Sequence, residues 1–149
     1  MMQKSDRLVA FVCTGNTCRS PMAQAIFNKL ASEKGLGVRA LSFGLAAVEG
    51  MRASVNSTKV CEEIGIDLSD FRTHFIYSYD IGQFEKFYCM SEDHRTILIN
   101  CGIEPERVVS MDVPDPFGGD LNIYRLCRDS IYNSVEEIIK EYENTENDA

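Results

Sequence analysis

The sequence of 149 residues contains no tryptophan, only four prolines and only two histidines. Zinc sites draw their ligands from clusters of histidine and cysteine, and the chain has neither such a cluster nor a Cys-x-x-Cys pair. We therefore expect no metal and no cofactor. His74 and His94 are expected to have structural rather than catalytic roles.

Long hydrophobic runs and positive charge are also scarce. No apolar stretch approaches the roughly 18 residues that a membrane span needs, and the segment from Met1 to Asp6 carries no apolar signal region. The formal net charge of −8 argues against nucleic acid and anionic membranes as partners. The six cysteines show no disulfide framework, which favours the cytoplasm, and four are expected as buried small hydrophobes: Cys61, Cys89, Cys101 and Cys127.

Strand-like and helix-like segments alternate along the chain. This order predicts one α/β domain over residues 1–149, with a four-stranded parallel sheet and helices on both faces. A polar, frayed tail is expected at residues 144–149. Strands are expected at residues 7–12, 38–43, 84–90 and 107–111. Helices are expected at residues 21–34, from Ser54 or Asn56 to 64, at 92–101 and from 121 to about 142, with short helical turns near 69–70 and within 74–81.

The eight residues Cys-Thr-Gly-Asn-Thr-Cys-Arg-Ser, here called the cysteine loop (residues 13–20), join the first expected strand to the first expected helix. Backbone N–H groups of such a loop and of a helix N-terminus favour an anion, and Arg19 can add a bidentate fork for two phosphate oxygens. The same field is expected to lower the pKa of the Cys13 thiol, which would make it a nucleophile. The pattern predicts phosphate transfer.

Expelling a poor leaving group from phosphate requires a proton donor. The acid loop (residues 112–119) offers Asp115, held between Pro114 and Pro116, with Phe117 placed to cover the mouth of the site. Asp112 is the competing acid in the same loop.

The cysteine loop after a first strand, followed far downstream by Asp-Pro-aromatic, resembles the low-molecular-weight protein tyrosine phosphatase family over nearly the whole chain. The resemblance implies the phosphotyrosine protein phosphatase I-like fold, a phosphorylated protein as substrate and inhibition by phosphate-like oxyanions. The sequence leaves the oligomeric state open, and a monomer is the expectation. It also implies that Cys13 forms a cysteinyl-phosphate, that Arg19 holds the phosphate and that Asp115 is the acid. The remaining residues it assigns to the phosphate site are Thr14, Gly15, Asn16, Thr17, Cys18, Ser20 and Phe117, with Ser20 assisting the thiolate and Asn16 holding the loop shape.

Three departures from the tyrosine-directed pattern concern the substrate. Residues 45–51 contain no aromatic wall, Gly118 stands where a second tyrosine is common, and Thr17 replaces an aliphatic residue. Missing aromatic partners weaken ring stacking, by about 0.5–1.5 kcal/mol per pair. Thr17 and the Pro-Asp-Pro-Phe-Gly run resemble the bacterial protein-arginine phosphatase branch, which favours phosphoarginine over the alternative, phosphotyrosine.

Other interpretations stay open at this point. A thiol-dependent arsenate reductase can share this fold, although Cys89 and Cys101 are poorly placed to relay a disulfide. A non-catalytic phosphoprotein-binding module or a phosphate carrier is a further alternative. Cys18, five residues from Cys13, could form a protective disulfide during oxidation.

Overall fold

A four-stranded parallel sheet forms the centre of the molecule. The computed structural model describes residues 7–147, so the segment from Met1 to Asp6 and the last two residues lie outside the described part. The strands run in the order β2-β1-β3-β4, with every neighbouring pair parallel. Their bounds are β1 Arg7–Cys13, β2 Val38–Gly44, β3 Lys86–Cys89 and β4 Val108–Ser110. The parallel sheet expected from the sequence is confirmed.

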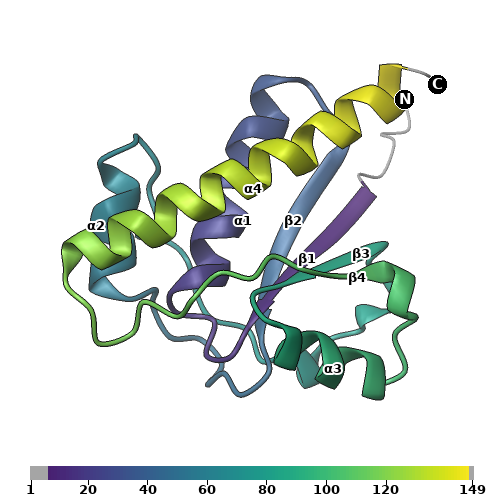
Figure 1. Ribbon diagram of the computed structural model, residues 1–149, viewed down its shortest axis with the longest axis horizontal. Coiled ribbons are helices and arrows are strands. Elements are labelled where there is room, and N and C mark those ends of the chain that lie inside the picture. Colours follow the sequence, from purple (N-terminus) through teal and green to yellow (C-terminus); the bar gives the residue numbers. More distant parts are fainter. Residues whose placement is uncertain (1–6, 148–149) are drawn as a thin grey trace.

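Helices cover both faces of this sheet. α1, α2 and α4 lie on one face and α3 on the other (Figure 1). The α-helices are α1 Arg19–Glu33, α2 Val55–Glu62, α3 Glu92–Asn100 and α4 Leu121–Asn147, and short 3₁₀ turns occupy Ile76–Ser78, Ile81–Gln83 and Pro105–Arg107. The result is the three-layer α/β arrangement that the alternating pattern predicts.

Buried side chains on both faces of β1 explain why the sheet needs two helical layers. Val9 and Phe11 pack toward α1 and α4, whereas Ala10 and Val12 pack toward α3. Phe11 also stacks on Tyr88 of β3, with ring centroids 5.5 Å apart. A strand that is apolar on both faces is typical of a parallel sheet buried between layers.

Several boundaries differ from the expected ones for local reasons. α1 begins at Arg19 rather than at residue 21, because Pro21 falls in the first turn, where a missing N–H costs nothing. α4 continues through Asn147, beyond the expected start of the tail at 144, and the Glu146 carboxylate accepts the Gly37 N–H at 3.2 Å. Cys101 is exposed at the end of α3, which corrects its expected burial.

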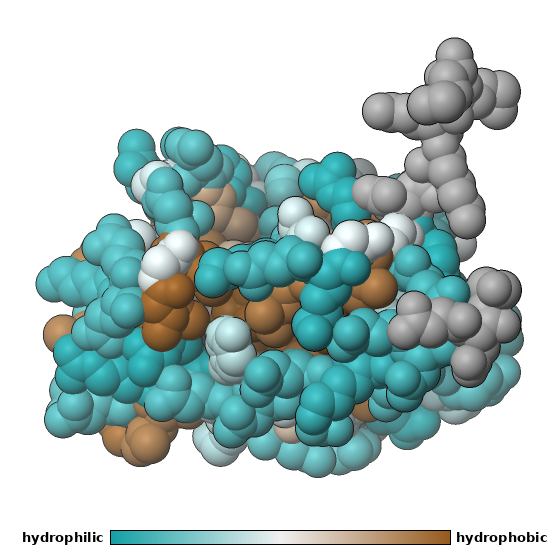
Figure 2. Space-filling model, turned by 90° about the horizontal axis from the view of Figure 1, so that it is seen from above, coloured by the Kyte–Doolittle hydropathy of each residue, from teal (hydrophilic) through white to brown (hydrophobic). Residues whose placement is uncertain are grey.

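The face of the molecule shown in Figure 2 is largely polar. Figure 2 shows hydrophilic side chains over most of one face, with hydrophobic residues visible in a hollow near its middle. Within residues 7–147, no helix combines the length with the apolar character needed to cross a membrane.

Gly44 ends β2 at a point of close approach between backbones. It pairs with Cys13, and a methyl group on it would lie 2.6 Å from the Ala47 Cβ and 2.7 Å from the Thr14 carbonyl oxygen. A glycine is therefore required where β2 passes the cysteine loop.

We predict that Gly44→Ala lowers the free energy of unfolding by about 1–3 kcal/mol, because overpacking a backbone contact forces the chain to shift. Urea denaturation followed by circular dichroism measures it. Gly37→Ala is the matched control, since a methyl group there meets only the Glu146 carboxylate, at 3.9 Å. Equal stability of the two variants would contradict the prediction.

Candidate active site

A cavity of about 220 Å³ lies at the carboxyl end of β1, beside the first turn of α1 and the acid loop. Ligands of open α/β sheets bind at this edge. Eight of the ten residues expected for the site line the cavity: Cys13, Thr14, Gly15, Thr17, Cys18, Arg19, Asp115 and Phe117.

The cysteine loop is held from outside by its carbonyl groups. Four of its carbonyl oxygens accept hydrogen bonds from the segment after β2 and from the start of α2. With these oxygens turned outward, the loop favours an anion at its centre, where backbone N–H groups gather. The four bonds are Leu45 N–H to Cys13 O at 3.0 Å, Ala46 N–H to Thr14 O at 2.9 Å, Ser54 N–H to Thr17 O at 2.8 Å and Ser57 Oγ to Cys18 O at 3.2 Å.

Asn16 fixes the shape of the loop from its buried side. Its backbone is left-handed, with φ of 59°, a conformation that asparagine adopts more readily than most residues. Its Oδ1 accepts the His74 N–H at 2.7 Å, while its Nδ2 donates to Ser20 Oγ at 2.7 Å and to Ser42 Oγ at 3.0 Å. Asn16 and Ser20 are fully buried behind the cavity and do not line it.

The sequence gives no direct signal for the partners of Asn16. Ser42 and the His74 backbone are 26 and 58 residues away from it in the chain.

The sulfur of Cys13 lies 2.8 Å from Ser20 Oγ and 3.2 Å from the Asn16 backbone nitrogen. Because Ser20 Oγ already accepts from Asn16 Nδ2, its own proton is free to point at the sulfur. Burial raises the pKa of the Cys13 thiol, whereas the hydrogen bonds from Ser20 and Asn16 and the charge of Arg19 lower it. The sequence predicted a net lowering of the Cys13 pKa, and this expectation is corrected. Burial raises the pKa by more than the hydrogen bonds and the Arg19 charge lower it.

Arg19 and Asp115 meet across the cavity. The buried Arg19 donates from Nη1 to Val113 O at 2.9 Å, and its Nη2 lies 3.9 Å from Asp115 Oδ2. The Asp115 side chain is 54% exposed and accepts the Phe117 N–H at 3.0 Å. Its carboxylate is therefore held at the mouth of the cavity, open to a substrate.

Asp112 is turned away from this position. Its backbone is left-handed, with φ of 54°, and its carboxylate accepts from Ser110 Oγ at 2.6 Å. It does not line the cavity. The geometry favours Asp115 over Asp112 as the acid.

One aromatic side chain, Phe117, lines the cavity, and it is 81% exposed. In residues 45–51 the exposed large hydrophobic side chains are Val48 and Met51, both aliphatic, and neither lines the cavity. Thr17 Oγ1 has only a distant contact, 3.7 Å from Cys18 Sγ. Cys18 and Cys13 are both free thiols, so their disulfide under oxidation stays a prediction.

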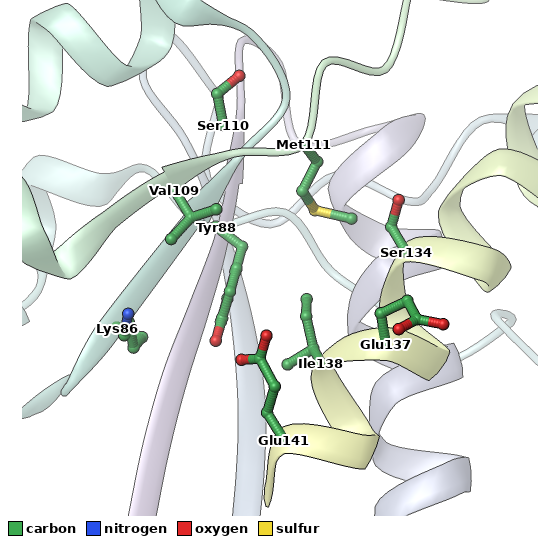
Figure 3. A pocket seen from close by; sticks show the side chains of 9 residues that line it. All are labelled: Lys86, Tyr88, Val109, Ser110, Met111, Ser134, Glu137, Ile138 and Glu141. Atoms are coloured by element: carbon green, nitrogen blue, oxygen red, sulfur yellow. The ribbon is translucent and has the colours of Figure 1, made fainter.

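A larger cavity, of about 370 Å³, lies between the β3–β4 edge of the sheet and α4. Tyr88, Met111 and Ile138 line it together with the carboxylates of Glu137 and Glu141 (Figure 3). It contains no residue of the cysteine loop, and two carboxylates repel a phosphate group. Within residues 7–147 no group of three or more metal-ligating side chains could hold a metal ion.

The parallel sheet and the cysteine loop at its carboxyl edge define an α/β protein built to hold an oxyanion at a helix N-terminus. Comparison with known families identifies the protein family to which the chain belongs. The family described as low molecular weight phosphotyrosine protein phosphatase matches residues 8–147. The chain belongs to this family and is a protein phosphatase of the low-molecular-weight type.

Relatives of both substrate classes are similar to the chain. A protein-arginine-phosphatase of Geobacillus stearothermophilus is 33% identical over 140 residues, covering 87% of this chain and 92% of that protein. The crystal structure of a low molecular weight protein tyrosine phosphatase from T. tengcongensis has a TM-score of 0.86 at 32% identity, covering 91% of this chain and 99% of the other. A YwlE arginine phosphatase variant, with a phosphorylated serine at its active site, has a TM-score of 0.86 at 29% identity, covering 91% and 95%.

We predict that Ser20→Ala raises the pKa of Cys13 further, because the hydrogen bond it removes favours the thiolate. The midpoint of iodoacetamide alkylation should move upward by about one pH unit, since a hydrogen bond to a charged group contributes about 1.5–3 kcal/mol. Ser57→Ala is the control: it removes a buried hydroxyl bonded to the loop carbonyl of Cys18 but not to the sulfur. An identical midpoint in wild type and Ser20→Ala would contradict the assignment.

Proposed function

We propose that this phosphatase uses Cys13 as nucleophile and Asp115 as general acid, with phosphoarginine in proteins as its preferred substrate. The observation that carries the mechanism is the single cavity shared by the Cys13 sulfur, the Arg19 guanidinium and the Asp115 carboxyl group. A nucleophile, an anion clamp and a proton donor within one cavity are what phosphoryl transfer needs.

In the first step the Cys13 sulfur attacks phosphorus as its thiolate, the form that the hydrogen bonds from Ser20 and Asn16 and the charge of Arg19 favour against the effect of burial. The S–P bond forms while the bond from phosphorus to the leaving nitrogen or oxygen breaks, and Asp115 gives that atom its proton. Arg19 binds equatorial phosphate oxygens together with the loop amides, through the guanidinium N–H groups that Val113 O does not occupy. The dephosphorylated side chain departs and Cys13 carries the phosphoryl group.

In the second step the Asp115 carboxylate takes a proton from water, and the hydroxide oxygen attacks phosphorus. The S–P bond breaks, inorganic phosphate leaves and the electron pair returns to the sulfur. The Ser20 hydroxyl, 2.8 Å from the sulfur, stabilises the departing thiolate. The phosphorylated active-site serine of the YwlE variant supports covalent transfer at this position.

Two features support phosphoarginine over phosphotyrosine. Thr17 places a hydroxyl in the cavity wall, where it can meet the polar nitrogen of a phosphoramidate. Residues 45–51 contain no aromatic side chain, so Phe117 is the one aromatic residue among those lining the cavity that could stack on a phenyl ring. The similar proteins include an arginine phosphatase and a tyrosine phosphatase at about the same identity, so they do not separate the two substrates.

The arsenate reductase alternative is less well supported. It needs cysteines poised to relay a disulfide, and Cys89 is fully buried in β3 with its thiol directed to backbone carbonyls. Cys101 is at the far end of α3, beside Tyr77. Neither belongs to the cavity of Cys13.

We predict that Cys13→Ser abolishes hydrolysis of p-nitrophenyl phosphate, because a serine hydroxyl has far too high a pKa to replace the thiolate. Asp115→Asn should lower kcat on phosphopeptides about 10²-fold or more, the usual effect of losing a general acid. Asp112→Asn is the matched control in the same loop and should keep kcat within a few-fold. A larger loss of kcat in Asp112→Asn than in Asp115→Asn would assign the role of general acid to Asp112. Undiminished turnover by Cys13→Ser would refute the mechanism.

For the substrate, we predict a higher kcat/KM on a phosphoarginine peptide than on a phosphotyrosine peptide of otherwise identical sequence. Thr17→Ile should shift the ratio toward phosphotyrosine, because it replaces the hydroxyl near the leaving group by an aliphatic side chain. Steady-state release of phosphate by one enzyme preparation measures both ratios. A wild-type preference for phosphotyrosine, or a ratio that Thr17→Ile leaves unchanged, would overturn the arginine assignment and leave the phosphatase mechanism intact.

A further inference from the structure

His94 lies on α3, on the opposite face of the sheet from α1, yet its side chain reaches the cysteine loop. Its Nε2 is 2.9 Å from Thr14 Oγ1, and the residue is only 6% exposed. The other ring nitrogen, Nδ1, is buried and is the one buried side-chain nitrogen or oxygen within residues 7–147 that has no hydrogen-bond partner. The imidazole is thus committed to a single contact, with the loop.

The missing partner of Nδ1 determines where the ring carries its proton. A buried N–H without an acceptor costs more than a buried lone pair without a donor, so the proton belongs on Nε2. Burial and the charge of Arg19 lower the pKa of His94, whereas Asp93 and Asp115 raise it. The lowering effects are the larger ones, which keeps the ring neutral, with one donor aimed at Thr14.

This tautomer sets the direction of the next hydrogen bond. Thr14 Oγ1 accepts from His94 Nε2–H, so the hydroxyl proton of Thr14 is free to be donated elsewhere. The Thr14 backbone carbonyl is already held from outside by Ala46 N–H at 2.9 Å, and Thr14 lines the cavity. Because Thr14 lines the cavity, this proton can be donated to an oxyanion bound there.

We propose that His94 is a positioning residue that orients the Thr14 hydroxyl as a side-chain donor to a phosphate oxygen of the substrate. The inference rests on the proposed function, since it assigns part of the phosphate-binding machinery of that same cavity. A role in packing alone would be better served by an apolar residue, because an imidazole with a bare buried nitrogen loses the hydration of that nitrogen without compensation.

Two substitutions at His94 separate positioning from packing. The amide nitrogen of Gln reaches the place of the imidazole Nε2, whereas that of Asn reaches only the place of Nδ1. His94→Asn should weaken binding of inorganic phosphate and raise KM for p-nitrophenyl phosphate, each about tenfold, because a hydrogen bond to a charged group is lost. His94→Gln should restore most of both. A purely structural role would lower the active fraction, and hence kcat, and leave KM and phosphate affinity in place.

Thr14 provides the second arm. Thr14→Val removes the hydroxyl at nearly constant volume and should weaken phosphate binding as His94→Asn does, while Thr14→Ser should retain it. The double variant Thr14→Val/His94→Asn should bind phosphate no more weakly than Thr14→Val alone, since the two residues act through one hydroxyl. Circular dichroism checks whether His94→Asn folds. If it does not, the Thr14 variants alone test whether the Thr14 hydroxyl binds phosphate.

Isothermal titration calorimetry with inorganic phosphate requires no turnover, so its result is independent of whether Cys13 and Asp115 have the proposed catalytic roles. Equal phosphate affinity in wild type, His94→Asn and Thr14→Val would overturn the inference. Additive losses in the double variant, or a Gln variant as weak as the Asn variant, would overturn it as well.

Discussion

The site depends on one constraint: the backbone of the cysteine loop must turn its carbonyl groups outward. Donors from the segment after β2 and from the start of α2 hold those oxygens, and Asn16 in its left-handed conformation closes the loop from behind. Each of these supports comes from a different part of the chain. The anion-binding geometry is therefore a product of the whole fold, and residues 13–20 would not keep it alone.

The phosphate site is locally positive, whereas the molecule as a whole is negatively charged. The chain has a formal net charge of −8, which repels anions at long range, but this effect is screened over about 10 Å at 0.1 M salt. Inside the loop, the buried Arg19 and the N-terminus of α1 supply the opposite field over a few ångströms. The Asp115 carboxylate, 3.9 Å from the Arg19 guanidinium, reduces that field. Affinity for phosphate thus has to be local.

Much of the fold and of the cavity lining could be predicted from the sequence, because both follow from local patterns. An apolar run, a cysteine loop and a helix that begins with arginine specify β1, the anion site and α1 together. The sequence favoured Asp115 over Asp112 through its flanking prolines and the family resemblance, but the left-handed backbone of Asp112 and its contact with Ser110, which turn it away from the cavity, could not be predicted. The prediction that the Cys13 pKa is lowered was wrong for a related reason. Burial of the sulfur is a tertiary property, and the chemistry of the loop alone suggests only the effects that lower the pKa.

Two polar relays approach the cysteine loop from opposite faces of the sheet. On the α1 side, Asn16 donates to Ser20, whose hydroxyl faces the Cys13 sulfur. On the α3 side, His94 contacts the hydroxyl of Thr14, the next residue along the chain. The two relays share no side chain, but both act on one loop whose shape Asn16 holds. The sulfur of Cys13 and the hydroxyl of Thr14, neighbours in the chain, are therefore each contacted from a different helical layer of the sheet.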